Sequence, residues 1–255
     1  MFARGLSFVP SRSCWIAALA VVCSPTQLIA QYDEPREYMP SEVRFLNVGL
    51  FQRDFRPRSS NPTSDSASID FKRMMPVIGF RQGPVDLTLG YTTYPLRGRS
   101  RSTVFLSALL SQDIPISGRR PSALVMPLAV SADYTKAEGI GPERENFNIA
   151  SIGLGIGLKY RYYASNLEFA LSALEAALYS NEGLSIGSGF SALTLGDVTL
   201  VLRDALMLDG IALGYRFRYQ TWSMNETRFN YASLSHGPFI GVLFWGYVLP
   251  RYTRG

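Results

Sequence analysis

The sequence predicts an all-β fold: a closed antiparallel transmembrane β-barrel of about 10 strands, with 8 or 12 strands also compatible with the pattern. Three observations support this prediction. Apolar side chains alternate with small or polar ones over stretches of about ten residues, and the chain after Ala30 has neither a cysteine nor an apolar run of helical membrane length. Because only helices and closed barrels span bilayers, a membrane crossing would have to be made by strands.

The N-terminal residues have the features of a secretory signal peptide. Arg4 and Arg12 make a basic start, the apolar core CWIAALAVVC follows, and SPTQLIA resembles a cleavage region that ends at Ala30. The core is shorter than the roughly 20 residues of a membrane-spanning helix, so an anchor is the weaker interpretation. We therefore predict a signal peptide at 1–30, a periplasmic extension at 31–41 and the barrel at 42–255.

Composition excludes several kinds of site. Both cysteines lie in the signal, so the mature chain has no disulfide and no cysteine metal site. Without Arg4 and Arg12, 23 basic residues (25 − 2) face 20 acidic ones, which is too even a balance to predict nucleic-acid binding. The run GLGIG matches no phosphate-binding loop, and no calcium-loop pattern occurs. We expect no cofactor and no metal.

The first five strands are expected between residues 42 and 134. Residues 42–55 and 69–81 alternate weakly, and Pro76 lies in the middle of the second segment. Clearer strands follow at 85–94, 102–112 and 122–134. The first of these three sets Val85, Leu87, Leu89 and Tyr91 against Asp86, Thr88, Gly90 and Thr92. Each has about the nine to eleven residues that a tilted strand needs to cross a bilayer.

The other five strands are expected at 151–163, 167–179, 193–208, 211–221 and 239–247. In the first of them, the large residues Ile152, Leu154, Ile156 and Leu158 alternate with Gly153, Gly155 and Gly157. One face is therefore apolar and the other nearly bare. Residues 167–179 are ambiguous, because their leucines also share one helical face, and a helix there would leave nine strands.

The connections between these segments alternate in length. The long RPRSSNPTSDSA, LRGRSRS, TKAEGIGPEREN, SNEGLSIGSGFSA and WSMNETRF alternate with QGP, ISGRRPS, ASN and LDG. Only ISGRRPS is longer than its position requires. Short periplasmic turns and longer external loops are typical of bacterial barrels, so both ends of the barrel sequence are expected on the periplasmic side.

Together, the signal, the absence of cysteine, the alternating strands and the alternating loops resemble a small outer-membrane β-barrel protein of Gram-negative bacteria. The resemblance covers nearly the whole mature chain and rests on pattern rather than on a motif. It implies a place in the outer membrane of the cell envelope and assembly by the barrel assembly machinery. One departure is the C-terminus: such barrels commonly end on an aromatic residue, whereas this chain continues past Pro250 to Gly255.

On this interpretation the large apolar face meets lipid, and the glycines of 151–163 point inward to make room for bulky neighbours from across the lumen. Lys159, Arg161, Arg216 and Arg218 lie near the ends of inward faces. Buried charges need partners, so acids such as Asp86, Asp113, Asp133 and Glu168 should contact them. We predict a lumen largely plugged by a charge network, with a narrow, porin-like, anion-preferring pore as the alternative.

Two arginine groups are expected in external loops. Arg97, Arg99 and Arg101 alternate in LRGRSRS, and Arg53, Arg56 and Arg58 cluster at the first long loop. Arginine binds phosphate in a bidentate manner, so outer-membrane lipid, and lipopolysaccharide in particular, is a candidate partner of Arg97, Arg99 and Arg101. A solvated loop without a ligand is the other interpretation.

The predicted function is non-enzymatic, either structural or surface-interacting. The alternative is a barrel enzyme for hydrolysis or acyl transfer that uses His236, the single histidine, with a serine from another strand such as Ser107 or Ser131. The neighbouring Ser235 would point to the other face of a strand. A third possibility is a soluble barrel or sandwich that holds an apolar ligand, which would require the large residues to face inward.

Overall fold

The structure of the protein is a computed structural model. It describes residues 44–58, 69–119, 121–140, 146–182, 187–203, 205, 209–225 and 230–243. The expected signal peptide, the extension 31–41 and the C-terminal end after Leu243 lie outside these ranges. Within them, no helix has the length and apolarity to span a membrane.

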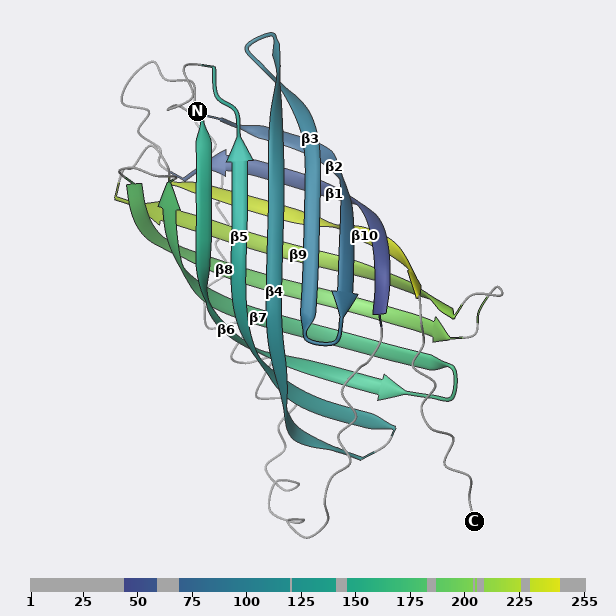
Figure 1. The fold of residues 1–255 in the computed structure, drawn as a ribbon. Coiled ribbons are helices and arrows are strands. Elements are labelled where there is room, and N and C mark those ends of the chain that lie inside the picture. The colour runs from purple at the N-terminus through teal and green to yellow at the C-terminus, as the bar shows by residue number, and fades with distance from the viewer. Residues whose placement is uncertain are drawn as a thin grey trace, which may run out of the picture. The chain divides into compact units, whose positions relative to one another are not determined.

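Ten antiparallel strands form a closed barrel in which each strand pairs with its neighbours in sequence and β1 pairs with β10 (Figure 1). The strands are β1 Arg44–Pro57, β2 Phe71–Gln82, β3 Val85–Leu96, β4 Arg99–Arg119, β5 Ser122–Ala137, β6 Phe147–Tyr163, β7 Leu167–Glu182, β8 Gly187–Arg203, β9 Gly210–Met224 and β10 Tyr231–Leu243. The predicted fold class, a closed antiparallel β-barrel of about ten strands, is confirmed.

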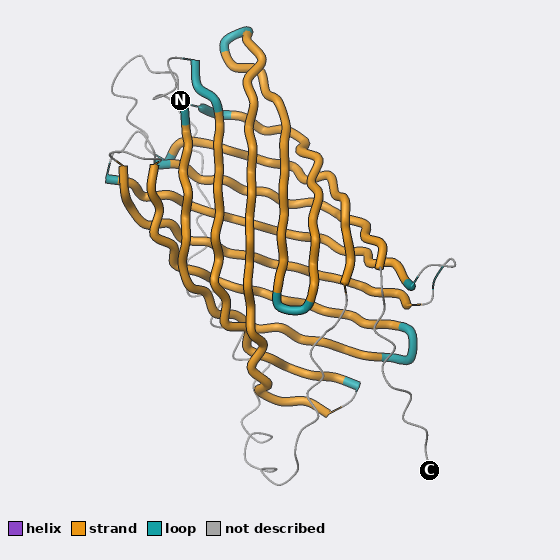
Figure 2. The backbone as a smooth tube through the Cα atoms, viewed as in Figure 1, coloured by secondary structure: helices purple, strands orange, loops and turns teal. Residues whose placement is uncertain are grey.

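The two ends of the barrel differ. We call the end where β1 begins and β10 finishes the terminal end, and the opposite end the loop end; Figure 2 shows the strands running between them. The connections 58–70 and 138–146 are at the loop end, and the turn at Gly83 and Pro84 is at the terminal end. This is the order of connections that the sequence predicted, with one exception at Arg97.

Several predicted boundaries are wrong. Residues 99–119 form one strand, so LRGRSRS contains only a two-residue turn at Arg97 and Gly98, and ISGRRPS contracts to a tight connection in which Arg119 pairs with Ser122. The last strand begins at Tyr231 rather than at 239. Polar residues at these strand ends pair in the ladder although they lie outside the apolar pattern, which explains why the pattern underestimates the strands.

The helix alternative for residues 167–179 is wrong. β7 pairs with β8 along its whole length, from Leu167 opposite Leu202 to Glu182 opposite Gly187, and with β6 from Glu168 to Asn181. Its even-numbered residues Leu174 and Leu178 are buried, while Leu171 and Tyr179 are exposed. A period of two therefore describes this segment, as in the other strands.

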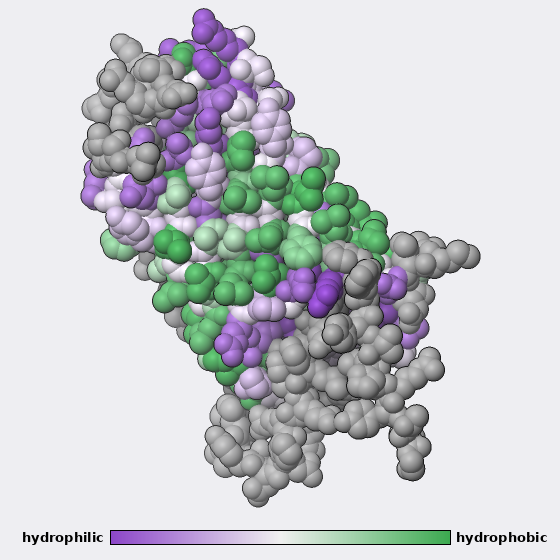
Figure 3. All heavy atoms as spheres, in the orientation of Figure 1, coloured by the Kyte–Doolittle hydropathy of each residue, from purple (hydrophilic) through white to green (hydrophobic). Residues whose placement is uncertain are grey.

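The apolar face of the wall points outward, as predicted. Leu154 is 70% exposed and Ile156 53% exposed, and most strands present similar side chains. Figure 3 shows a band of apolar residues across the visible face, with hydrophilic residues gathered towards the loop end. An outward apolar band on a closed barrel is the arrangement that a lipid bilayer requires. The alternative of a soluble barrel with large residues inside is contradicted.

The glycines of β6 face the lumen, but the reason predicted for them is wrong. A Cβ at Gly153 would lie 2.0 Å from the carbonyl oxygen of Ala177, and one at Gly157 would lie 2.2 Å from that of Ala173. The obstacle is therefore the backbone of the neighbouring strand β7 rather than bulky side chains from across the lumen. Glycine allows this close approach of β6 to β7.

The lumen is not filled by small and ionic groups alone. At the loop end, buried aromatic and aliphatic side chains pack together into what we call the aromatic plug: Phe55, Ile69, Phe71, Tyr94, Ala137, Phe147, Ile149, Trp222, Met224 and Tyr231. The ring of Phe55 lies 4.8 Å from that of Tyr231 and 5.0 Å from that of Phe147, centroid to centroid. The residues come from the loop ends of seven strands and from the segment just before β2, so the plug joins most of the wall at that end of the barrel.

Candidate functional site

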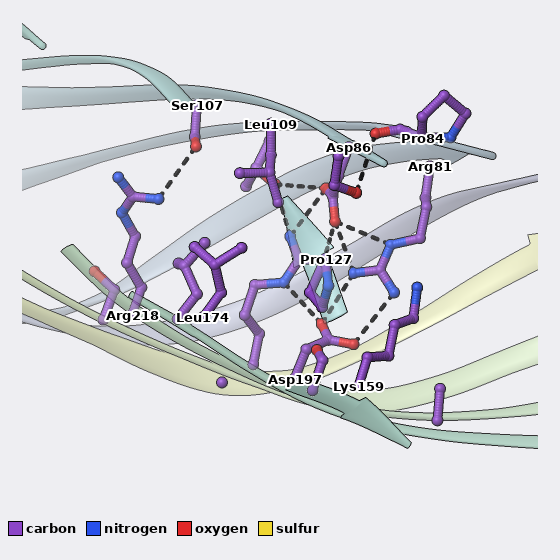
Figure 4. Close-up of a pocket in the computed structure, with 18 of the residues that line it drawn as sticks. Arg81, Pro84, Asp86, Ser107, Leu109, Pro127, Lys159, Leu174, Asp197 and Arg218 are labelled. Atoms are coloured by element: carbon purple, nitrogen blue, oxygen red, sulfur yellow. Dashed lines mark hydrogen bonds and ion pairs between the residues drawn. The ribbon is translucent and has the colours of Figure 1, made fainter. Parts of the chain in front are cut away.

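Two arginines and two aspartates form a closed ring of ion pairs across the lumen, which we call the ionic ring. Arg81 at the end of β2 lies 2.7 Å from Asp86 at the start of β3 and 3.0 Å from Asp197 on β8. Arg216 on β9 completes the ring, at 2.8 Å from Asp86 and 3.0 Å from Asp197 (Figure 4). The β2–β3 hairpin is thereby joined to the β8–β9 pair in another part of the wall.

Two threonines satisfy further hydrogen bonds of the ionic ring. Arg216 donates to the hydroxyl of Thr88 at 2.8 Å, and Thr199 donates to Asp197 at 2.5 Å. The four charged side chains are between 11% and 23% exposed, and their formal charges cancel. Such a neutral, fully paired set avoids most of the cost of placing charge inside a barrel.

A second charged group lies nearer the terminal end and joins β4 to β6. One carboxylate oxygen of Asp113 accepts a hydrogen bond from Arg161 at 2.7 Å and another from Lys159 at 3.3 Å. Arg161 is almost completely buried, with its side chain 3% exposed. Two cations therefore share one carboxylate oxygen.

Two more pairs complete the charged part of the lumen. Arg218 on β9 lies 2.8 Å from Asp133 on β5 and donates to Ser107 at 3.2 Å. Arg203, at the end of β8, lies 3.1 Å from Glu168, at the start of β7. The first pair crosses the lumen, whereas the second joins neighbouring strands.

A cavity of about 110 Å³ lies among these charged groups. Its walls include the ionic ring, Asp113, Lys159 and Arg218, the serines 107, 111, 172 and 235, and the turn at Gly83 and Pro84. Figure 4 shows Lys159 near Arg81.

The structure therefore places the predicted lumen residues Lys159, Arg161, Arg216, Arg218 and Asp86 inside the barrel. It also adds residues that the sequence analysis missed, namely Arg81, Asp197 and Arg203. All three lie on the inward face of their strands, where every second residue points into the lumen. Continuing the alternation to the ends of the predicted strands would have found them, but not their partners.

Arg53 is not in an external loop, as the sequence suggested, but on β1 inside the lumen, 1% exposed. Its guanidinium carbon lies 5.5 Å from the ring centroid of Phe105 and 5.6 Å from that of Phe55. It also donates to the sulfur of Met75 at 3.8 Å. The prediction failed because β1 continues to Pro57, and only Arg56 and Arg58 of this group are exposed.

Arg97, Arg99 and Arg101 do not share one environment in the structure. Arg97 is exposed at the turn with a φ of 46°, in the left-handed region that L-residues rarely adopt. Arg99 is also exposed, whereas Arg101 donates to the carbonyl of Ile140 at 3.2 Å. Nearby, the Ser102 backbone N–H donates to Glu138 at 3.0 Å, which lowers the pKa of that carboxyl from its ordinary value.

His236 faces away from the lumen. Its ring Nδ1 shares a hydrogen bond with the hydroxyl of Tyr215, an outward residue of β9 that is 45% exposed. The serines that the sequence analysis considered as partners, Ser107 and Ser131, are buried on the inward face. The wall of the barrel separates them from the imidazole.

No group of histidine, cysteine or acidic side chains suited to a metal ion occurs in the ranges that the structure describes. No protein-family model and no curated protein matches the chain.

Solved barrels show limited likeness to this chain. Neisserial surface protein A is 14% identical, with a TM-score of 0.30, over 79% of this chain and 97% of that one. The outer membrane protease OmpT from Escherichia coli is 8% identical, with a TM-score of 0.39, over 83% and 99%. OpdQ from Pseudomonas aeruginosa is 8% identical, with a TM-score of 0.20, over 79% and 99%.

Proposed function

We propose that the protein is a non-enzymatic β-barrel of the bacterial outer membrane, exported by its signal peptide, whose lumen is plugged and whose role is structural or surface-interacting. The observation that carries the proposal is that packed side chains occupy both halves of the lumen. The aromatic plug fills the loop end and the ionic ring spans the terminal half, with a cavity of about 110 Å³ between charged walls. A barrel of this strand number has an interior that side chains can fill.

Planar-bilayer conductance tests the plugged lumen. If the aromatic plug and the ionic ring together leave no continuous path for hydrated ions, the wild-type barrel should give no steady ohmic current. A matched variant with Phe147→Ala and Trp222→Ala, which removes two buried rings from the plug, should raise the frequency of conducting events. A wild-type current as large and as steady as that of the variant would show that the lumen conducts.

The absence of enzyme activity is supported by the outward position of His236. A hydroxyl nucleophile needs its base within hydrogen-bond reach, and the bond of His236 is to Tyr215 on the outer face. His236→Ala should therefore leave every phenotype of the protein unchanged. An esterase or peptidase activity of the purified barrel that this substitution abolishes would overturn the proposal.

For the surface role, the β3–β4 hairpin offers Arg97 and Arg99 to phosphate groups of lipopolysaccharide. Asparagine is favoured over arginine where a two-residue hairpin turn requires positive φ, so Arg97→Asn should relieve strain rather than cause it. The double variant Arg97→Asn/Arg99→Gln should fold normally and bind lipopolysaccharide vesicles more weakly, with Arg56→Gln as the exposed control. Equal binding by all three chains would favour the solvated-loop interpretation.

A further inference from the structure

An acidic side chain lies within the outward apolar face of the barrel. Along β7 the outward rings of Phe169 and Tyr179 are ten residues apart (179 − 169), about the length with which a tilted strand crosses a bilayer. Glu175 lies between them on the same face and is exposed. At a tilt of about 45° and a rise of about 3.3 Å per residue, Glu175 lies about 9 Å deeper than Tyr179 along the membrane normal. A carboxyl group at this depth faces hydrocarbon rather than water.

Glu175 has no side-chain partner within the described part of the barrel. None of the described residues forms a hydrogen bond or an ion pair with its carboxyl group, or with the hydroxyl of Thr194, which lies directly opposite on β8. Polar side chains are costly on a lipid-facing surface, and an ionisable one inside the membrane indicates a functional contact. The two side chains therefore point to a contact outside this chain.

The surface around Glu175 and Thr194 has a shape that fits another convex wall. Their outward neighbours on the same two strands are small, and we call the six residues the β7–β8 patch: Ala173, Glu175, Ala177, Ala192, Thr194 and Gly196. Larger outward side chains flank the patch, namely Leu154 and Ile156 on β6 and Phe217 and Tyr219 on β9. Two barrels side by side approach most closely along a narrow line, where small residues permit contact, and larger residues on each side fill the widening gap.

We propose that the β7–β8 patch is the contact surface of a symmetric homodimer in the membrane. In a two-fold contact the same patch meets itself, so each Glu175 can accept a hydrogen bond from the Thr194 hydroxyl of the other copy. These reciprocal bonds satisfy both polar side chains of each chain, whereas an unrelated partner with one basic group would satisfy Glu175 alone. The inference rests on the membrane position in the proposed function, because an exposed carboxyl group in water needs no partner.

Cysteine cross-linking in lipid vesicles tests the contact surface. Both native cysteines lie within residues 1–30, so the barrel from residue 31 onward offers no other thiol. Ala177→Cys should give a covalent dimer with a short thiol-reactive linker, because residues near a two-fold axis meet their own copies. Ala108→Cys, at an outward position on β4, is the matched control and should remain monomeric. Equal yields from the two variants, including none from either, would overturn the contact surface.

Subunit counting by single-molecule photobleaching in vesicles tests the polar pair. The wild-type barrel should show two subunits at low protein-to-lipid ratio. Glu175→Leu removes two hydrogen bonds from the dimer and should raise its dissociation constant by about tenfold or more, whereas Glu175→Gln keeps an acceptor and should retain the dimer. Leucine suits a lipid-facing position, so Glu175→Leu should not lower the urea midpoint of the barrel, which separates a lost contact from misfolding.

Three outcomes would reject the homodimer: a wild-type barrel that is monomeric at every ratio, open-ended clusters of more than two subunits, or a Glu175→Leu variant that associates as tightly as the wild type. Membrane fractionation of the same samples distinguishes this failure from that of the proposed function. A monomer in the membrane fraction would reject the dimer and retain the proposed function, and a barrel in the soluble fraction would reject both.

Discussion

Substitution of Asp197 by asparagine should destabilise the barrel by about 3 kcal/mol. Asp197 accepts two hydrogen bonds from Arg81, at 3.0 and 3.2 Å, one from Arg216 at 3.0 Å and one from Thr199. Asparagine keeps the shape, but it removes the negative charge and turns one acceptor oxygen into a donor that faces guanidinium hydrogens. Breaking a buried ion pair from one side costs about 3 to 5 kcal/mol, and partial solvent access of Asp197, 12%, favours the lower value.

The assay is urea unfolding in detergent micelles, followed by the fluorescence of Trp222, which is 1% exposed in the folded barrel. Asp70→Asn, an exposed carboxylate just before β2, is the control. The double variant Asp197→Leu/Arg216→Met restores neutrality in the ring, so it should cost less than Asp197→Asn alone. A loss below about 1 kcal/mol for Asp197→Asn, equal to that of the control, would show that the ionic ring does not stabilise the fold.

Three further predictions concern other parts of the barrel. Gly153→Ala should lower the free energy of unfolding by about 2 kcal/mol or prevent folding, because its Cβ would lie 2.0 Å from a β7 carbonyl oxygen. Gly196→Ala, whose Cβ would lie 3.7 Å from its nearest neighbour, should be tolerated, and urea unfolding compares the two variants. Phe147→Ala should cost about 3 to 5 kcal/mol in the same assay, since this fully buried ring touches three others; a cost below about 1 kcal/mol would contradict a packed plug. Glu138 has a lowered pKa in the folded protein, so it stabilises the fold above its unfolded pKa and loses that contribution as the pH falls through the folded value. Glu138→Gln should therefore reduce the loss of unfolding free energy on acidification over this pH range. An unchanged pH dependence would show that the hydrogen bond between Ser102 and Glu138 does not stabilise the fold.

The wall of the barrel could be predicted from the sequence because it depends on local periodicity. Along β5, β6 and β9, large apolar side chains alternate with small or polar ones, so one face of each strand points outward and the other into the lumen. The observed exposure of Leu154 and Ile156 follows from this alternation. The predicted ends of the strands were less accurate. Where the wall leaves the apolar band, polar residues such as Arg101 continue the ladder, and the apolar pattern that marks a strand disappears.

The contents of the lumen could be predicted only in part. Alternation identifies Arg216 as inward, and its partner Asp197 lies directly opposite it on the neighbouring strand β8. Its other partner, Asp86, lies on β3, and which distant strands face each other depends on closure and tilt of the barrel. The aromatic plug was missed for a related reason. Its members occupy single positions near strand ends, such as Phe55 and Trp222, and only the closed barrel brings them together.

The aromatic plug also compensates for a weakness in the wall. The β2–β3 ladder extends only from Val77 opposite Gly90 to Gln82 opposite Val85, although both strands continue to the loop end. Pro76, which has no N–H to donate, lies where the ladder stops. Beyond it, the strands are joined by a hydrogen bond from the Thr92 hydroxyl to the Met74 carbonyl, at 2.9 Å, and by the stacked rings of Phe71 and Tyr94, with centroids 4.0 Å apart. Phe71 and Tyr94 of the aromatic plug therefore also hold β2 and β3 together where these two strands share no backbone ladder.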